Sequence, residues 1–296
     1  MSNVKRKKIE TKKIETKKTG LKREILDKYY TTQSTVNICM SLFKQQISIT
    51  DKDLCVEPSA GNGSFATAIK DLFSIYKFYD IQPENECIEK FDYLDFNIDK
   101  HISTEEKMQV KKIHVIGNPP FGRQSTLAIK FIKISCSYCD TLSFILPKSF
   151  KKESMKKYFP LTFHLKCEFD LPKNSFIVDD KEHDVPCVFQ IWEKREEERK
   201  IAEKLEPYNF KFVKKETDHD ISFRRVGINA GVIDKNTSEK SHQSHYFIKF
   251  KEGVFTDETF QQIKNLQYEN SENTVGPKSI SKQELIKEFN MILKRD

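Results

Sequence analysis

The chain has 296 residues, 37% of them hydrophobic, and a formal net charge of +7. This length can hold one full α/β domain plus a smaller unit. No stretch approaches the roughly 18 apolar residues of a membrane span, and the basic N-terminus lacks the apolar run of a signal peptide. We therefore expect a soluble, intracellular protein. Its seven cysteines are expected to be reduced thiols, and Cys136 and Cys139 lack the further ligands of a zinc site.

The positive charge is concentrated at the N-terminus. Residues 1–23 carry a net charge of +8, whereas the remaining 273 residues carry −1. Residues 7–11 and 12–16 both read Lys-Lys-Ile-Glu-Thr, without a core-forming pattern, and we expect the segment to be disordered. It could contact phosphates, act as a nuclear-localisation signal or only aid solubility. Since the rest of the chain is nearly neutral, bulk charge gives no argument for nucleic acid.

The predicted elements form two units, a domain over residues 24–206 and a small α+β appendage over residues 207–296. In the domain, residues 32–43 favour a helix with Thr32 or Ser34 as its N-cap. Alternating strands and helices follow to about residue 158, strands at 161–170 and 185–192 complete a mixed sheet, and the charged residues 193–206 favour a bridging helix. In the appendage, strands are expected at 210–213, 221–228 and 246–250, and helices at 256–267 and 281–294.

A glycine-containing turn follows the first buried strand. Residues 53–65 read as a strand that runs into a turn with Gly61 and Gly63, and a helix is expected over 65–73. The two glycines let the backbone approach a ligand closely, at the edge where open α/β sheets bind cofactors. The pattern lacks the third glycine of a dinucleotide fingerprint and the Gly-Lys-Ser/Thr of a P-loop.

A second motif, Asn118-Pro119-Pro120-Phe121, ends the apolar strand that begins at residue 113. The prolines stiffen the backbone, so that the Asn118 side-chain oxygen and the Pro119 carbonyl can act as paired acceptors beside the ring of Phe121. A planar amino group could donate both hydrogens to these acceptors while its plane lies against the ring. The alternative is a rigid turn without chemistry.

Together the two motifs resemble those of class I S-adenosylmethionine-dependent amino methyltransferases, most closely those that methylate adenine N6. The resemblance covers residues 29–192. It implies a Rossmann-like, mostly parallel sheet with an antiparallel last strand. It also implies S-adenosyl-L-methionine as cofactor, nucleic acid (DNA or RNA) as partner and no metal. A partner subunit is possible.

The resemblance also assigns roles to individual residues. Residues 27–36 resemble the segment that closes over the methionine end of the cofactor. Asp80 ends the second strand and is placed for the ribose hydroxyls, and Asp92, or else Asp95, would accept from the cofactor's adenine amino group. The implied cofactor residues are Tyr30, Thr31, Glu57, Ser59, Gly61, Gly63, Asp80 and Asp92, and the implied catalytic residues are Asn118, Pro119, Pro120 and Phe121.

Further residues are candidates for binding the substrate. Phe176, in a hairpin over residues 173–192, fits the position of a second aromatic ring against the target base, beside Phe121. Arg224, Arg225 and Asn229 could contact phosphates or bases.

The spacing of the two acids restricts the connection between their strands. Only eleven residues separate Asp80 from Asp92, and Pro83 is among them. The usual helix there must therefore shrink to a turn or two at most.

Four functions remain open from the sequence. Adenine-N6 methylation of DNA is favoured, and the same reaction on RNA is the nearest alternative. Methylation of a protein glutamine amide is disfavoured, because that family usually has Tyr where Phe121 stands. A non-catalytic binding subunit is disfavoured because the motif residues are retained together.

Overall fold

The computed structural model describes residues 28–274 and 276–294. The basic segment 1–23 lies outside these residues, so the expectations for it stay predictions. None of the helices in the described ranges is long and apolar enough to cross a membrane.

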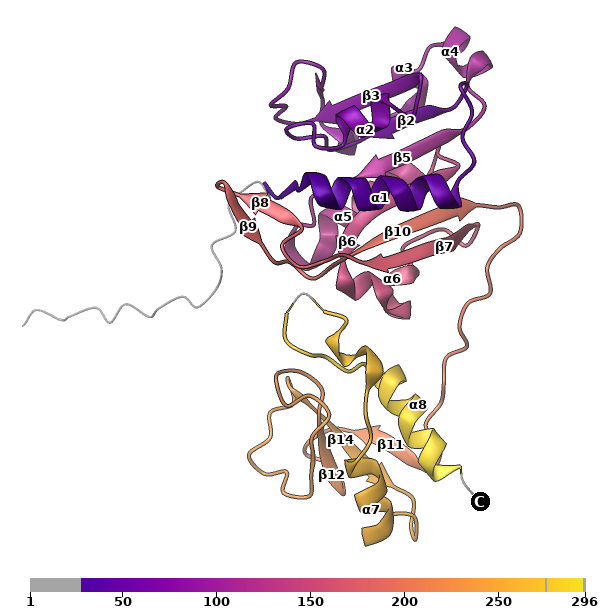
Figure 1. Cartoon of the computed structure of the whole chain (residues 1–296). Coiled ribbons are helices and arrows are strands. Elements are labelled where there is room, and N and C mark those ends of the chain that lie inside the picture. Colours follow the sequence, from indigo (N-terminus) through magenta and orange to yellow (C-terminus); the bar gives the residue numbers. More distant parts are fainter. Residues whose placement is uncertain (1–27, 275, 295–296) are drawn as a thin grey trace, which may run out of the picture.

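A seven-stranded sheet forms the centre of the larger unit (Figure 1). Its strands are β2 (Leu54–Glu57), β3 (Ile75–Asp80), β4 (Glu89–Lys90), β5 (Ile113–Gly117), β6 (Thr141–Pro147), β7 (Phe163–Asp170) and β10 (Cys187–Lys194). The order across the sheet is β4-β3-β2-β5-β6-β10-β7, and β10 runs antiparallel to both β6 and β7 whereas the other pairs are parallel. This confirms the expected Rossmann-like sheet of the class I methyltransferase type, mostly parallel with an antiparallel last strand.

Helices cover both faces of this sheet. They are α1 (Gln33–Gln46), α2 (Ala66–Lys70), α3 (Ile98–His101), α4 (Thr104–Gln109), α5 (Thr126–Cys136) and α6 (Glu153–Lys156), with 3-10 turns η1 (Tyr93–Asp95), η2 (Arg123–Ser125) and η3 (Lys148–Lys151). The central strands β2 and β6 are buried along their whole length, as expected for strands covered on both faces. Successive β2 residues alternate between two hydrophobic clusters, with Cys55 in one and Leu54 and Val56 in the other.

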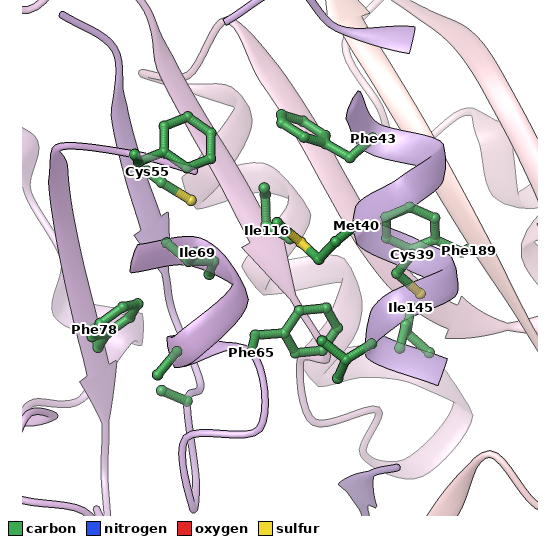
Figure 2. Packing of buried hydrophobic residues seen from close by; sticks show 14 of the residues in the cluster. Cys39, Met40, Phe43, Cys55, Phe65, Ile69, Phe78, Ile116, Ile145 and Phe189 are labelled. Carbon is green, nitrogen blue, oxygen red and sulfur yellow. The ribbon is translucent and has the colours of Figure 1, made fainter. Parts of the chain in front are cut away.

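The helix α1 confirms the expectation for residues 32–43. The Thr32 side chain accepts from the backbone N–H of Thr35 and so caps the helix. Val36, Met40 and Phe43 recur on one face, and Figure 2 shows Met40 and Phe43 beside Ile116 of β5. Burial of each such side chain contributes roughly 1.5–3 kcal/mol, so packing on the sheet fixes α1.

A small three-stranded sheet joins the N-terminal segment to the hairpin late in the domain. It contains β1 (Tyr30–Thr31), β8 (Phe176–Val178) and β9 (Lys181–His183), in the order β1-β8-β9. Thr31 pairs with Phe176, and the Thr32 N–H donates to the Ser175 carbonyl. The segment that the sequence assigns to cofactor closure is thereby held in place by the hairpin.

The C-terminal part has its own sheet and core. The sheet contains β11 (Phe210–Val213), β12 (Ile221–Arg224), β13 (Ile233–Asp234) and β14 (His245–Phe250), in the order β11-β14-β12-β13. Helices α7 (Asp257–Lys264) and α8 (Lys282–Leu293) and the 3-10 turn η4 (Glu269–Glu272) accompany it. A separate hydrophobic cluster over residues 210–293 includes Phe223, Ile248 and Phe289. The expected strands and helices of this part are confirmed, with β12 ending four residues early.

A charged side chain of the larger part contacts the appendage. Lys152, beside η3, donates to the carbonyl and hydroxyl of Ser279 at 2.8 and 3.2 Å, and its Nζ lies 3.8 Å from a carboxylate oxygen of Glu284 in α8. Lys152 is only 12% exposed, and its burial lowers its pKa. In Figure 1 the appendage lies below the sheet, and an extended stretch of chain joins the two.

The expectation of a helix over residues 193–206 is wrong. Glu193 and Lys194 belong to β10, and residues 195–207 form no regular helix. The Arg199 guanidinium donates to the carbonyls of Lys156, Phe159 and Phe163. These bonds hold the stretch against the large domain, and tertiary contacts of this kind override a local helix preference.

Two further expectations concern short helices. No helix lies between β3 and β4, which confirms the compact connection inferred from Pro83. The helix expected over 65–73 is shorter, with α2 covering Ala66–Lys70 and turns on either side.

Candidate functional site

A cavity of about 530 Å³ opens at the carboxyl ends of β2, β3 and β5. This is the edge at which open α/β sheets place ligands. The cavity is large enough for a cofactor of the size that usually occupies pockets of 300–1,000 Å³. Nine of the residues singled out from the sequence line it: Tyr30, Thr31, Glu57, Ser59, Gly61, Asp80, Asp92, Asn118 and Pro120.

The glycine turn is fixed to the end of β3 by hydrogen bonds. Gly61 has φ +54° and donates its N–H to Asp80 Oδ2 at 2.8 Å, while Gln82 donates its N–H to Asp80 Oδ1 at 2.7 Å. A Cβ at Gly61 would lie 3.3 Å from the Tyr30 ring, so a side chain there would crowd the closing segment. Gly63, with φ +88°, follows in the same turn without lining the cavity.

Glu57, the last residue of β2, is a buried acid without a complete set of partners. It is 1% exposed, and its Oε2 has no hydrogen-bond partner among the residues that the structure describes. Burial, with a further contribution from the charge of Asp80, raises the pKa of Glu57 to about 8. At neutral pH the side chain is therefore mainly a neutral carboxylic acid, able to donate as well as accept.

The closing segment is held across the cavity by Glu84. The Tyr30 hydroxyl donates to Glu84 Oε1 at 2.5 Å, and Lys28 Nζ donates to the same oxygen at 2.8 Å. The Glu84 backbone N–H donates to the Gly61 carbonyl at 3.0 Å. Desolvation and Glu84 raise the pKa of Tyr30, and the two donors lower the pKa of Glu84. This set of contacts connects the glycine turn to the segment that the sequence assigns to cofactor closure.

Asn118, immediately after β5, carries an unsatisfied acceptor. Its Nδ2 donates to the Tyr29 carbonyl at 3.1 Å, and because a carbonyl can only accept, this bond fixes which end of the amide is nitrogen. Its Oδ1 is buried and has no partner within the described ranges. The Asn118 backbone carbonyl accepts from Ser59 Oγ at 3.1 Å, which ties this strand tip to the turn after β2.

The rest of the Asn-Pro-Pro-Phe motif is placed differently from Asn118. Pro120 lines the cavity, whereas Pro119 is buried and does not line it. Phe121 is half-buried, packs against both hydrophobic clusters of the domain and does not line the cavity. The predicted contact between Phe121 and a base stays a prediction.

Of the two acids that the sequence offers for the cofactor's adenine amino group, Asp92 lines the cavity and Asp95 does not. Asp92 lines the cavity beside Phe91 and Leu94, and its carboxylate accepts from the Leu94 N–H at 2.9 Å. Asp95 does not line it. Of the two acids that the sequence left open, the geometry therefore favours Asp92.

The other substrate candidates are not brought to this cavity. Phe176 is 1% exposed, and its ring contacts Tyr29 edge to face at 6.3 Å. Arg224 donates to the Val226 carbonyl and Arg225 to the Gln243 carbonyl, both within the appendage, where Asn229 is exposed. The roles assigned to these residues stay predictions.

Some lining residues escaped the sequence analysis, among them Glu84, Arg123 and Leu127. Glu84 lies in an irregular loop, where an acid gives no periodic signal. Arg123 follows Gly122, whose φ is +66° and where a Cβ would lie only 2.8 Å from Leu127 Cγ. The glycine immediately after the Asn-Pro-Pro-Phe motif was the available signal for this close approach.

Comparisons with known proteins give likenesses in structure only. No family model matches the sequence, and no curated protein matches it. A Pyrococcus horikoshii protein described provisionally as an RNA methyltransferase is 16% identical, with 57% of this chain and 87% of that chain covered at a TM-score of 0.44. A Listeria monocytogenes protein described provisionally as a class I S-adenosylmethionine-dependent methyltransferase is 15% identical (58% and 63% covered, TM-score 0.42).

A third solved structure is the methyltransferase subunit of a type I restriction-modification system from Streptococcus thermophilus. It is 14% identical, with 56% of this chain and 45% of that chain covered at a TM-score of 0.41. Likenesses at this level carry no argument about activity or substrate. The assignment of the fold rests on the order and direction of the strands.

Proposed function

We propose that this protein is an S-adenosylmethionine-dependent methyltransferase that acts on the N6 amino group of adenine in nucleic acid, with DNA as the favoured substrate. The observation that carries the proposal is Asn118 Oδ1, a buried acceptor without a partner among the described residues, at the tip of β5 beside the cavity. A buried polar atom left unpaired costs roughly 1–3 kcal/mol. Such an atom at a cavity wall is best explained by a donor that arrives with a ligand.

The residues around the cavity fit the cofactor. The turn at Gly61 permits close backbone approach, Asp80 and Asp92 offer carboxylate oxygens, and Tyr30 and Thr31 line the same cavity. When bound, the cofactor would supply a methyl group from a positively charged sulfur, which would keep the electron pair of the broken bond.

The chain's own contribution is alignment and charge stabilisation. Asn118 Oδ1 would accept one N–H of the adenine amino group, and the Pro119 carbonyl, which does not line the cavity in this structure, would accept the other after a local rearrangement. These bonds favour a pyramidal nitrogen whose lone pair points at the methyl carbon, and they stabilise the positive charge that develops on nitrogen. After transfer the nitrogen loses one proton to water, so the reaction needs no strong general base.

Access to Asn118 requires a local rearrangement. Its Oδ1 is covered, and its Nδ2 is bonded to the backbone of Tyr29, whose ring packs against Phe176. Movement of the segment at Tyr29 would uncover both Asn118 and Phe176. A base from a duplex would also have to be flipped out of its stack.

The test is an incubation of the full chain with isotopically labelled S-adenosylmethionine and separate pools of duplex DNA, single-stranded DNA, RNA and protein. We expect N6-methyladenine in DNA, identified by mass spectrometry of the nucleosides. Label in RNA alone would show that the substrate is RNA. Label in protein glutamine would refute the proposal in favour of a protein glutamine methyltransferase. Calorimetry that detects no binding of the cofactor would refute the enzyme.

A further inference from the structure

A second cavity, of about 330 Å³, lies in the appendage. It is formed by β11 and the residues after it, by β14 and the turn before it, and by the first residue of α8. None of the substrate candidates inferred from the sequence lines it. Its lining residues are Phe212, Val213, Lys214, Lys215, Glu216, His242, His245, Tyr246, Phe247 and Lys282.

The positive charge of this cavity is mostly uncompensated. Lys214 and Lys282 are exposed and have no carboxylate within ion-pair distance in the part of the chain that the structure describes, and Lys215 donates to the Ser238 carbonyl. Glu216 is the single acid among the lining residues.

Four other lysines of the appendage have carboxylate partners at short distances. The pairs are Lys235–Asp257, Lys240–Asp234, Lys249–Asp218, Lys249–Asp220 and Lys278–Glu272, all at 2.6 to 2.9 Å. The cations of the cavity differ from these four in having no carboxylate partner among the described residues.

Aromatic rings lie beneath one of these cations, Lys282, and beside the neighbouring Arg225. Lys282 Nζ is 4.5 Å from the ring centre of Phe212 and 5.7 Å from that of Tyr246, and the Arg225 guanidinium is 5.6 Å from the Tyr246 ring. The two rings meet edge to face at 5.5 Å. Cations that track phosphates beside half-buried aromatic rings are the combination by which proteins hold single-stranded nucleic acid.

We propose that this cavity binds a nucleotide unit of a single-stranded nucleic acid, with Lys214, Lys215 and Lys282 on its phosphates and Tyr246 or Phe212 against its base. The inference rests on the proposed function for its substrate class, but it does not depend on methyl transfer. Lys282 lies two residues before Glu284, which meets Lys152 of the catalytic domain. A strand held here thus lies near the junction with that domain, and the cavity would retain a flanking part of the strand whose adenine is modified.

The experiment compares binding by the full chain and by two variants. Fluorescence anisotropy would be recorded with labelled oligothymidine and oligouridine strands of roughly 15 nucleotides, which separate DNA from RNA, over a salt series. The test variant is Lys214→Gln with Lys282→Gln. The control is Lys287→Gln, an exposed lysine further along the same helix and outside the cavity.

We expect the double variant to bind about tenfold more weakly at low salt, with a salt slope smaller by about 1 to 1.5, because two phosphate contacts are lost. The control should stay within about twofold of the unmodified chain. Photo-crosslinking with 4-thiouridine or 5-iododeoxyuridine strands should label the peptides that contain Phe212 or Tyr246.

Equal affinity of the double variant, an equal loss in the control or crosslinks confined to residues 1–23 would overturn the proposal. Weakened binding of the double variant without any methylation would leave the cavity assigned and refute the proposed reaction. Methylation together with unchanged binding by the double variant would support the proposed reaction and refute the assignment of the cavity.

Discussion

The two sides of the main cavity differ in how completely their polar groups are satisfied. On the side of the glycine turn, Asp80 accepts from the N–H groups of Gly61 and Gln82, and Glu84 accepts from Lys28 and Tyr30. The carboxylates of Asp80 and Glu84 are thus both already part of a hydrogen-bonded framework. Such a framework is preorganised, so a ligand that uses it need not order it.

At the tips of β2 and β5, by contrast, two buried polar atoms have hydrogen-bonding capacity that no described residue satisfies. Glu57 Oε2 and Asn118 Oδ1 are both buried, and neither has a partner among the described residues. Native proteins leave few such atoms, and each lowers the free energy of unfolding. One side of the cavity is therefore preorganised for a ligand, while the other keeps polar atoms unpaired at a cost in stability.

The largest expected effect comes from removing the free acceptor of Asn118. Asn118→Ala should lower kcat by about 10²–10³-fold, as loss of one preorganised transition-state contact does, and leave the Kd for S-adenosylmethionine within about twofold. Steady-state methylation and calorimetry measure the two quantities. The melting temperature should change little, since the substitution removes the unsatisfied Oδ1 but also the bond from Nδ2 to the Tyr29 carbonyl.

A matched control for Asn118 lies in the same cavity. Asn62 also lines it, but its Oδ1 already accepts from the N–H and hydroxyl of Ser64. Asn62→Ala should therefore change kcat by less than about fivefold. Similar losses in the two variants would show that cavity shape, and not a free acceptor, is what turnover requires.

The next largest effect is expected from removing the carboxylate of Asp80, which holds the glycine turn. Asp80→Ala leaves the Gly61 and Gln82 N–H groups without their acceptor, and we expect cofactor affinity to fall by about 10–100-fold. Titration calorimetry measures it. Asp95→Ala, at an acid outside the cavity, should bind the cofactor normally, and an unchanged affinity for Asp80→Ala would remove Asp80 from the cofactor site.

The effect of the buried Glu57 side chain on the free energy of unfolding can be tested by varying the pH. Its pKa of about 8 in the folded protein lies above the ordinary value of 4.5, so the favourable contribution of its protonated form is complete below about 4.5 and is lost as pH rises through 8. Glu57→Gln does not titrate. The variant should therefore gain stability relative to the unmodified protein between pH 5 and 8, by on the order of 1–3 kcal/mol, and the gain should level off above pH 8.

Denaturant unfolding at a series of pH values measures this difference, in which the other titrating groups cancel. Glu84→Gln is the control of opposite sign, because its donors lower the pKa of Glu84 and its charge stabilises the fold at neutral pH. A difference for Glu57→Gln that does not change with pH would mean that the Glu57 side chain is solvated in solution.

Several strand ends and turns around the cavity could be predicted from the sequence. Asn118 directly follows β5 and Gly61 lies in the turn after β2, and the ends of such apolar runs are legible where they stop at Gly or Pro. The place of Asp80 at the end of β3 came instead from the family resemblance. The strands of the appendage were also legible, because runs such as residues 246–250 alternate or are continuously apolar.

What could not be predicted depends on contacts between distant residues. The side chains of residues 193–206 favour a helix, and bonds to distant residues, among them the three carbonyls that Arg199 reaches, explain the extended path. An aromatic residue such as Phe176 can face either a ligand or the core, and local pattern does not distinguish the two. The Glu84 carboxylate finds its partners in Tyr30 and Lys28, which are more than fifty positions away along the chain.

The smallest expected effect concerns the closing segment, where the satisfied side of the cavity reaches across its opening. The carboxylate of Glu84 is 39% exposed, so its ion pair with Lys28 is screened by solvent and should contribute well under about 1 kcal/mol to stability. Cofactor binding should respond more, because the same carboxylate also holds the Tyr30 hydroxyl. Glu84→Gln keeps an acceptor for Tyr30 but loses the charge, and we expect about a two- to fivefold faster release of cofactor, with a difference that shrinks at high salt.

Tyr30→Phe separates the two contacts of Glu84. It removes the hydroxyl and keeps the ring beside Gly61, so its effect on release should not depend on salt. Stopped-flow displacement of a fluorescent cofactor analogue measures both rates. If Glu84→Gln and Tyr30→Phe release the cofactor at the unmodified rate, the segment at residues 28–31 does not close the cavity. The free acceptor of Asn118 would then be exposed to water whenever Tyr29 moves, and the contrast between the two sides would no longer account for catalysis.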